Sequence, residues 1–385
     1  MPVRRLVPAM LFVTTLAGLE ACVDDVSPFR AEGRPDRAPP VRLTTGPGED
    51  RLPAWSTDGR SIYYIAERFD GLDQVEGLLL RLPADGGSAS PALLNVQSPG
   101  ARSEPWLVAP APAPGGQRIA FSEIIQAWPP HPCRLGPFHL SCTPTLSEED
   151  ARLPPLRRLA QRVRELDATG PLEEDRSLEF DVLGVTPSLI VNNYPFQAAF
   201  ARERAFGLRA SWDPAGERLA FSDGLRLYVW SVGSEDAEPI PNSEDAIWPA
   251  WSPDGERIAF TRLPRADSSS AVCRYFDNVG ALNCIQQRTD YIAGPARLSL
   301  IRPDGSGLTE IGEGYEPAWA PDGGSLFFRR GSGIWRSGVE GAGAAPVPGG
   351  AGAREPAVSP DGQRLAVAKL SEGGDHDIWV LPLEP

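Results

Sequence analysis

The residues most able to bind a metal or form covalent cross-links are five cysteines and three histidines. Four of the cysteines form two local pairs, Cys133 with Cys142 and Cys273 with Cys284. In an oxidising compartment we expect each pair to form a disulfide that closes a loop of about ten residues, which stabilises a fold by about 2–3 kcal/mol. Four cysteines allow three connectivities, and local bonding is the one the spacing favours.

The first cysteine pair also allows a different chemistry, because two histidines lie beside it. His131, Cys133, His139 and Cys142 offer the four nitrogen and sulfur ligands that a tetrahedral zinc site requires. Export to an oxidising compartment favours the disulfide over the metal site. We therefore expect neither a metal nor a cofactor.

Common catalytic motifs are missing from the sequence. It contains no G-x-S-x-G nucleophile motif and no H-E-x-x-H metalloprotease motif. The third histidine, His376, lies far along the chain from the other two and is interpreted as a solvated loop residue. The sequence therefore predicts a protein that is not an enzyme.

Three glutamates stand at what looks like the same place in a repeat. Glu104, Glu316 and Glu355 each precede a proline that opens an apolar strand. If these strands line one channel, their carboxylates gather at its mouth. Together with the formal net charge of −14, this predicts a cationic or basic ligand. The alternative is that each glutamate is a solvated residue at the start of a strand.

A repeated hairpin must position these residues. Its clearest copy, from Ile247 to Phe260, reads I-W-P-A-W-S-P-D-G-E-R-I-A-F, an apolar strand, a turn and an apolar return strand. In the turn, Pro presets φ, Asp bonds to its own backbone and Gly supplies a positive φ. The hairpin occurs six times, and the glycines of its six turns are Gly59, Gly116, Gly216, Gly255, Gly323 and Gly362.

The spacing of the hairpins predicts the fold. Gly216 and Gly255 are 39 residues apart, as are Gly323 and Gly362. A period of about 40 residues, with further strands after each hairpin, is typical of a β-propeller. We therefore predict an all-β fold, a six-bladed β-propeller of four-stranded blades. The strand at residues 40–45 is expected to complete the last blade and so close the ring.

Tryptophans recur at the end of the first strand of the hairpin. At this position we expect them to pack between neighbouring blades as part of the core rather than to bind a sugar. They are Trp55, Trp106, Trp212, Trp251 and Trp319.

The motif P-x-W-S-P-D-G-x-x-I-A-F, repeated in this way, resembles the TolB-type propeller, a Pro-Asp-motif relative of the WD repeats. The resemblance covers Pro39 to Pro385 and implies one propeller domain over residues 40–385. Two copies depart from the motif. The second lacks the Asp-Gly turn, and the sixth has Val358 where Trp is usual.

The first 22 residues predict a targeting segment. Arg4 and Arg5 precede an apolar run from Leu6 to Leu19 that is short for a membrane span. Leu19-Glu20-Ala21-Cys22 resembles a bacterial lipobox, which implies that Cys22 carries the lipid anchor. An ordinary secretory signal is the alternative. Residues 23–39 are rich in Pro and charged residues and predict a flexible tether.

Two insertions interrupt the repeats, at residues 128–205 in the second unit and 262–297 in the fourth. In the first, Ser147 is a plausible helix N-cap, and an apolar stripe follows it, which predicts a helix from Ser147 to Asp167. Segments 178–185 and 188–191 are expected to be outer strands of the second blade or a degenerate seventh blade. Six blades are favoured.

The acidic balance of the chain argues against a nucleic-acid partner, because phosphate binding needs a basic surface. We expect a monomeric lipoprotein of the bacterial cell envelope, in the periplasm or on the outer surface. Its expected function is a non-catalytic platform that binds a protein or peptide. The alternative is an enzyme or a glycan-binding propeller whose site lies in the central channel.

Overall fold

The computed structural model describes twelve stretches of the chain. With the exception of Ala38, all of them belong to one compact unit, Pro39–Pro385. The described stretches are residues 38–69, 75–93, 106–127, 133–135, 140–142, 156–168, 175–183, 209–224, 226–263, 265–276, 281–292 and 295–384.

The turn of each hairpin except the second is built from its own polar side chains, as the sequence predicts. In the fourth blade, Gly255 has φ of 76° and donates its N–H to the carbonyl of Ser252 at 2.9 Å. The hydroxyl of Ser252 donates to Asp254 at 2.5 Å and accepts the N–H of Arg257 at 2.9 Å. The turn thereby satisfies its own backbone groups, so the two strands leave it already paired.

Each blade is an antiparallel sheet of four strands. The bounds of the strands, blade by blade, are as follows. The first blade contains β2 (Glu49–Trp55), β3 (Ser61–Phe69), β4 (Val75–Pro83) and β5 (Ser90–Pro91); the second contains β6 (Trp106–Pro112), β7 (Arg118–Ala127), β10 (Leu156–Glu165) and β11 (Arg176–Leu183); the third contains β12 (Ser211–Trp212), β13 (Arg218–Ser222), β14 (Leu227–Ser231) and β15 (Glu238–Pro239).

The other three blades follow the same order. The fourth contains β16 (Ala246–Trp251), β17 (Ile258–Arg262), β20 (Arg297–Ile301) and β21 (Thr309–Glu313); the fifth contains β22 (Tyr315–Trp319), β23 (Ser325–Arg330), β24 (Gly333–Gly338) and β25 (Ala345–Ala351); the sixth contains β26 (Ala353–Val358), β27 (Arg364–Leu370), β28 (His376–Pro382) and β1 (Val41–Arg42).

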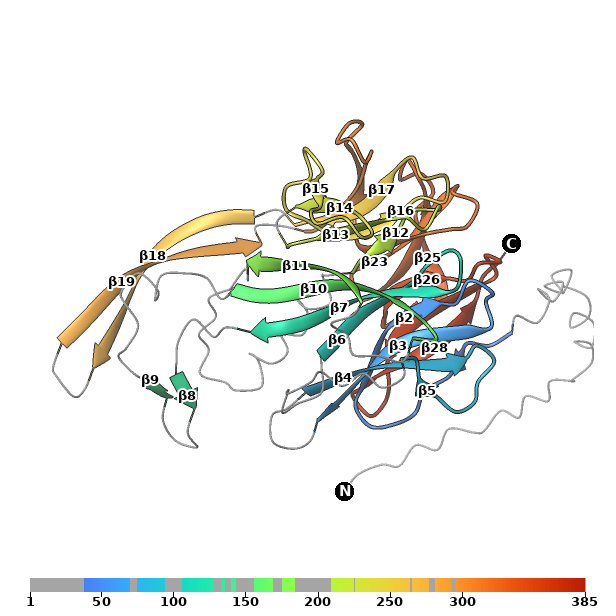
Figure 1. Cartoon of the computed structure of the whole chain (residues 1–385), viewed down its shortest axis with the longest axis horizontal. Helices are drawn as coiled ribbons and strands as arrows, with labels where there is room; N and C mark the ends of the chain where they lie inside the picture. Colours follow the sequence, from blue (N-terminus) through green and yellow to red (C-terminus); the bar gives the residue numbers. More distant parts are fainter. Residues whose placement is uncertain are drawn as a thin grey trace, which may run out of the picture. The chain divides into compact units, whose positions relative to one another are not determined.

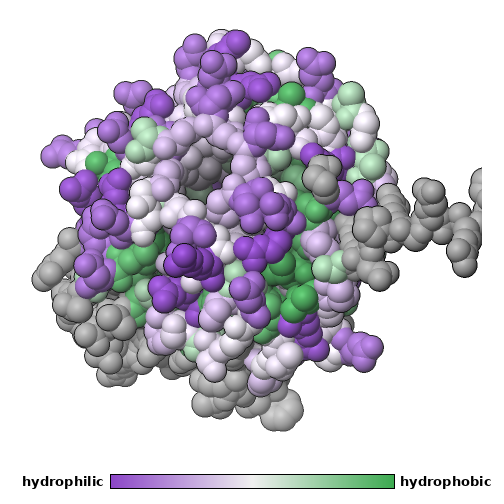
Figure 2. All heavy atoms as spheres, turned by 90° about the vertical axis from the view of Figure 1, so that its right-hand side faces the viewer, coloured by the Kyte–Doolittle hydropathy of each residue, from purple (hydrophilic) through white to green (hydrophobic). Residues whose placement is uncertain are grey.

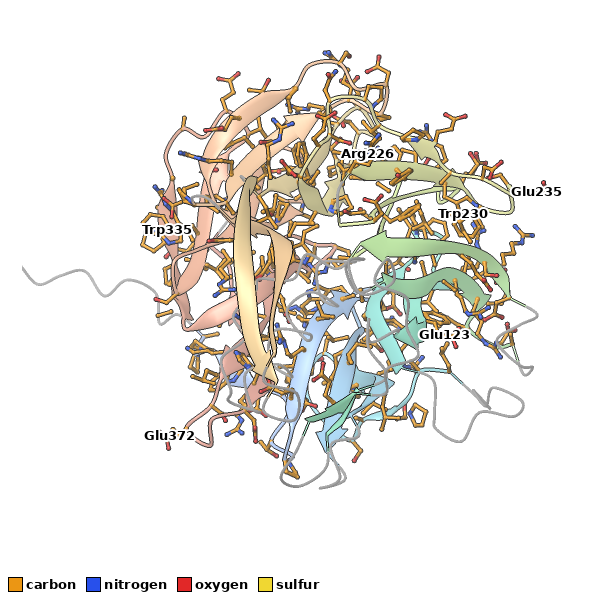
Figure 3. The ribbon with its side chains drawn as sticks, turned by 90° about the vertical axis from the view of Figure 1, so that its left-hand side faces the viewer. Glu123, Arg226, Trp230, Glu235, Trp335 and Glu372 are labelled. Atoms are coloured by element: carbon orange, nitrogen blue, oxygen red, sulfur yellow. The ribbon has the colours of Figure 1, made fainter. Side chains whose placement is uncertain are left out.

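The six blades form a closed ring, which confirms the predicted six-bladed propeller. The first strands of most neighbouring blades contact one another, so they form the inner wall. Figure 3 shows the blades following one another around the centre, with Glu123 in the second blade, Trp230 in the third and Trp335 in the fifth. The predicted closure is confirmed as well, because β1 supplies the fourth strand of the last blade, with Val41 opposite Val380.

Four of the five repeated tryptophans lie between blades, as predicted; the exception is Trp106, which starts β6 six residues before Pro112, the residue at the repeat position. Trp55, Trp212 and Trp319 are at most 8% exposed, and each donates its indole N–H to a carbonyl of the preceding blade. An arginine of that preceding blade also stacks on each ring. These cation–π pairs are Arg364 on Trp55, Arg118 on Trp212, Arg218 on Trp251 and Arg257 on Trp319, at 4.7–5.4 Å from guanidinium carbon to ring centroid.

The predicted helix at residues 147–167 is wrong over most of its length. Residues Leu156–Glu165 form β10, the third strand of the second blade, and the earlier residues of the predicted helix lie outside the described stretches of the chain. The strand is stabilised by partners that are distant in sequence. Gln161 bonds Ser122, and Arg162 forms an ion pair with Glu123 on β7. These partners allow charged residues to be buried in the strand. The sequence therefore lacks the alternation of apolar and polar residues that marks a strand, and the spacing of its apolar residues resembles that of a helix.

The predicted strand at residues 178–185 is largely confirmed by β11, which is the outer strand of the second blade. Two further hairpins extend from the insertions and can be followed on the left of Figure 1: β8 (Cys133–Leu135) with β9 (Leu140–Cys142), and β18 (Arg265–Phe276) with β19 (Ala281–Ile292). Each hairpin connects the second strand of its blade to the third. Equivalent connections of a propeller emerge on one face, so both hairpins arise from the same face of the ring.

Within the described stretches, no helix is both long and apolar enough to cross a membrane.

Candidate functional site

The first strand of most blades contains a bulge at one repeat position of the inner wall. The residue at this position precedes a proline, and its φ is between 53° and 56° although it is not glycine. The ladder register shifts at the same point in each of these strands. Such positive φ values are costly for residues with a side chain and mark a constrained position. The residues are Leu52, Ala109, Trp248, Glu316 and Glu355.

This position corrects the predicted set of three glutamates. Glu316 and Glu355 do occupy equivalent places in the fifth and sixth blades. In the second blade the equivalent residue is Ala109, because β6 starts at Trp106 and has its bulge at Ala109. Glu104 precedes β6 and lies outside the described residues. The Glu-Pro-Trp run resembled the repeat motif but falls five residues too early.

The two glutamates link neighbouring blades. One carboxylate oxygen of Glu316 accepts the N–H of Glu355 at 2.6 Å, and one of Glu355 accepts the N–H of Leu52 at 2.7 Å. Thr261 has the same role in the preceding blade, since its hydroxyl accepts the N–H of Glu316 at 3.1 Å. Each side chain therefore satisfies the backbone of the bulge in the next blade, which is a structural role.

Both glutamates are also neutralised by arginines. Glu355 is 2% exposed and accepts two hydrogen bonds from Arg51, at 2.5 and 3.0 Å. Burial acts to raise the pKa of Glu355, but the charges of Arg51 and Arg354 and the bonds to Arg51 and Leu52 outweigh it, and the pKa falls to about 2. Arg329 lies 3.4 Å from Glu316. Neither carboxylate is left to bind a cation.

Arg209 reaches the centre of the ring from the third blade, where it stands three residues before Trp212 as Leu52 does before Trp55. Its guanidinium donates to the carbonyl of Pro53 in the first blade at 3.5 Å. Because these two blades are not neighbours, the side chain must extend across the channel. Burial lowers the pKa of Arg209, and the carboxylates of Glu355 and Glu316 offset that effect only partly. Within the described stretches, no carboxylate lies within ion-pair distance of it.

The charged groups that interact with Arg209, Arg51 and Arg354 include one more arginine than glutamate. Arg354 has its pKa lowered by burial first and then by repulsion from Arg51 and Arg329. Among the described residues, the cluster contains four arginines and three glutamates, which leaves one positive charge in a chain of formal net charge −14. We call it the channel cluster; it comprises Arg51, Arg209, Arg329, Arg354, Glu67, Glu316 and Glu355. Figure 2 shows a hollow near the centre of one face of the ring, bordered by hydrophilic side chains.

Sequence reasoning missed the arginines of the channel cluster. Arg209 could have been found by aligning the third copy of the repeat with the others, since it falls on the position of Glu316 and Glu355. Arg51 precedes Leu52 in the first copy, and Arg354 precedes Glu355 in the sixth, at the same offset. The signal was therefore a repeat position just before the Pro-Ala-Trp motif.

The backbone places the predicted cysteine pairs opposite each other. Cys133 faces Cys142 across β8 and β9, and Cys273 faces Cys284 across β18 and β19. Directly opposed residues of antiparallel strands have Cβ atoms about 4.5–5.5 Å apart. This register agrees with local pairing, and the disulfides themselves stay a prediction. Cys22, His131 and His139 lie outside the described residues.

His376 is the last of the residues that the sequence singled out. His376 begins β28 and lies 2.7 Å from the carboxylate of Glu49, so it is paired rather than simply solvated. In the stretches that the structure describes, no three His, Cys, Asp or Glu residues are grouped as metal ligands.

No protein-family model and no curated protein matches the sequence. Among solved structures, the chain is similar to a glucose dehydrogenase, with 16% identity, a TM-score of 0.50 and coverage of 90% of this chain and 100% of the other. The fold is a six-bladed β-propeller. It is also similar to a TolB-type protein from Agrobacterium tumefaciens (16% identity, TM-score 0.47, covering 88% and 92%) and to an oligogalacturonate lyase in complex with manganese (12%, 0.44, covering 89% and 79%). At these identities the likeness concerns the fold alone.

Proposed function

We propose that this propeller is a non-catalytic binding platform whose protein or peptide partner inserts an acidic group into the channel cluster. The observation that carries the proposal is Arg209, a guanidinium held across the channel with a carbonyl at 3.5 Å as its hydrogen-bond acceptor. An arginine in such a place is suited to bind a carboxylate through paired N–H donors. The predicted basic ligand is replaced by an acidic one, because Glu316 and Glu355 are occupied by the chain itself.

Burial makes this site selective. A partially desolvated guanidinium binds a carboxylate more strongly than an exposed one, because the local dielectric is lower. The surrounding net charge of −14 repels most acidic molecules, so only a group shaped to enter the channel gains the contact. The proposed cellular setting is the bacterial envelope, with the propeller as a monomer anchored through the lipid on Cys22.

The test is a crosslinking pull-down from the envelope fraction of the native host. The baits are the wild-type chain, Arg209→Gln, and Arg60→Gln as a matched control, since Arg60 is an exposed arginine on a hairpin turn. A Cys22→Ser version of each bait separates binding from membrane attachment. We expect one partner to be retained by the wild type and Arg60→Gln and reduced at least tenfold with Arg209→Gln.

Two outcomes overturn the proposal. Equal capture by all three baits places the partner elsewhere on the surface. If no bait enriches a partner, the platform function fails and the enzyme or glycan-binding alternative gains support.

A further inference from the structure

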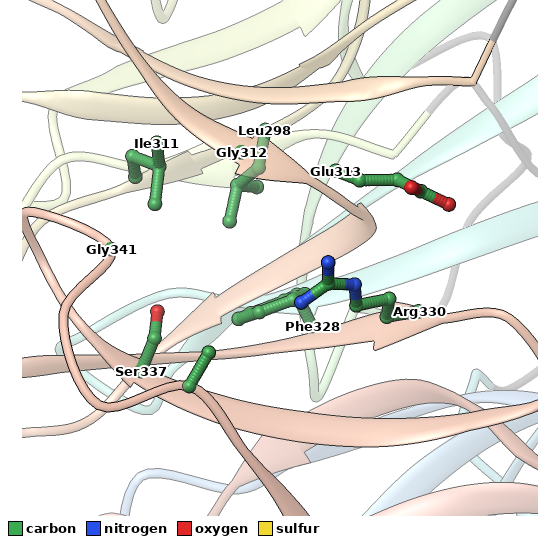
Figure 4. Close-up of a pocket in the computed structure, with 9 residues that line it drawn as sticks. Leu298, Ile311, Gly312, Glu313, Phe328, Arg330, Ser337 and Gly341 are labelled. Atoms are coloured by element: carbon green, nitrogen blue, oxygen red, sulfur yellow. The ribbon is translucent and has the colours of Figure 1, made fainter.

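A second candidate site lies between the fourth and fifth blades, away from the channel. It is a hollow of about 240 Å³ between β20 and β21 on one side and β23 and β24 on the other (Figure 4). Ile311 and the edge of Phe328 supply the apolar part of its lining, while Gly312 and Gly341 line it with backbone, so its accessible surface is more polar than apolar. A hollow with convergent polar groups beside apolar side chains is a candidate small-molecule site.

The first polar group is the hydroxyl of Ser337. The side chain is 2% exposed, and its oxygen has no hydrogen-bond partner among the described residues. Figure 4 shows this oxygen pointing from β24 into the hollow, toward Ile311. Buried hydroxyls without a protein partner are rare, so this one is available to bond a water or a ligand atom.

The second polar group is the guanidinium of Arg330, on the far side of Phe328 from Ser337 (Figure 4). Its flat face lies against Trp335, with 5.2 Å between guanidinium carbon and ring centroid. Among the described residues it forms neither a hydrogen bond nor an ion pair. Stacking occupies the face of a guanidinium and leaves the N–H groups on its edge able to bind a carboxylate. Glu313, at the rim, points away from the hollow.

We propose that this hollow binds a small monocarboxylate with an apolar body. The carboxylate pairs with the edge of Arg330, the apolar body packs on Phe328 and Ile311, and a polar atom of the ligand meets the hydroxyl of Ser337. By volume alone a ring-sized acid fits, because a closed cavity of about 150 Å³ accepts benzene and this open hollow measures about 240 Å³. The inference is independent of the channel cluster and of the partner proposed for it.

The test measures binding of defined probes to the whole mature chain by calorimetry and ligand-observed NMR. The probes are phenylacetate, benzoate and 4-methylpentanoate, with phenethylamine as a cationic isostere and acetate as a probe without an apolar body. We expect at least one of the three acids to bind with Kd on the order of a millimolar or tighter, and both comparison probes to bind at least tenfold more weakly.

Two variants assign the contacts. Arg330→Gln is expected to weaken the acid at least tenfold, whereas Arg302→Gln, which removes an exposed arginine outside the hollow, leaves the Kd unchanged. Ser337→Ala separates a ligand contact from a structural one. It removes an unpaired buried hydroxyl, so the free protein melts at the same or a higher temperature while the acid binds more weakly.

Three outcomes contradict the proposal. They are the absence of binding for all three acids at about 10 mM, equal binding of phenethylamine, and binding that Arg330→Gln leaves unaltered.

Discussion

Glu355 is the residue through which the channel cluster affects stability. Its pKa is ordinarily near 4.5 and falls to about 2 in the folded chain. A carboxylate with a lowered pKa contributes stability above its unfolded pKa, and that contribution is lost as pH falls toward the folded value. The difference of about 2.5 units corresponds to about 3 kcal/mol, lost between about pH 5 and pH 2.

The prediction concerns Glu355→Gln, which removes this titration. We expect the variant to be less stable than the wild type at pH 7, because Arg51 and Arg354 lose a charged partner, and the two chains to converge as pH approaches 2. Urea unfolding at several pH values measures this. Glu256→Gln, at an exposed turn position, should follow the wild-type curve. A constant gap between Glu355→Gln and the wild type from pH 7 to pH 2 would contradict the assignment.

Sequence analysis could find Glu316 and Glu355 but not their role. Both stand out because a glutamate precedes the repeated proline. Their partners depend on how the ring closes: Arg51 and Glu355 are 304 residues apart and meet only because the first and last blades are neighbours. Without that closure, two acidic residues in an acidic chain are most simply read as solvated or as a cation site.

Among the structural elements, the second blade shows where a sequence pattern becomes ambiguous. The other hairpins were predictable because turn and strands lie within 14 residues, as in Ile247 to Phe260. Strand β10 has no such turn beside it and carries several arginines along its length. The burial of Arg162 and Arg164 is made possible by acidic partners on other segments, Glu123 and Asp175. A local pattern cannot show these partners, so helical spacing was the simpler interpretation.

The arginine and the tryptophan that stack between two blades are predicted to make coupled contributions to the free energy of unfolding. Arg257 stacks on Trp319 of the next blade at 5.4 Å. Trp319→Leu alone should lower the free energy of unfolding by about 3 kcal/mol, because a buried indole is lost. In a double-mutant cycle with Arg257→Gln, we expect a coupling of about 0.5–1 kcal/mol. Arg60→Gln is the control and should be additive with Trp319→Leu. A zero coupling for Arg257 would mean that its contact with the ring contributes nothing.

The two inserted hairpins carry the prediction about covalent links. Because Cys133 faces Cys142 and Cys273 faces Cys284, local disulfides require no change of register. Thiol titration of the unfolded, non-reduced Cys22→Ser chain should find no free thiol. Cys273→Ser should release one thiol and lower stability by about 2–3 kcal/mol. If two thiols titrate and zinc is released on unfolding, the first hairpin binds a metal instead.

At the scale of the whole molecule, the arginine and tryptophan positions vary together around the ring. Arginine follows the turn glycine by two residues in the second, third, fourth and sixth blades, and the blade after each of these has its tryptophan. The first and fifth blades have Ser61 and Ser325 there, and the blades after them have Pro112 and Val358 in place of tryptophan. The arginine and the tryptophan therefore occur together at the same blade interfaces, including the one between the sixth blade and the first.

Strand β1 closes the ring, so its loss should affect the whole molecule. Beyond the ladder with β28, Arg42 pairs with Asp377 at 2.7 Å, and the hydroxyl of Thr44 accepts the N–H of Ile378 at 2.9 Å. Deleting residues 31–46 removes these contacts and exposes the edge of β28, which can then pair with another chain. We expect the melting temperature to fall by about 5–10 °C and oligomers to appear in size-exclusion chromatography.

A deletion of residues 23–37 spares β1 and should leave a monomer of wild-type stability. If the longer deletion behaves in the same way, β1 does not hold the ring closed, and the contacts between the first and sixth blades, from Arg51 to Glu355 and from Arg364 to Trp55, must suffice.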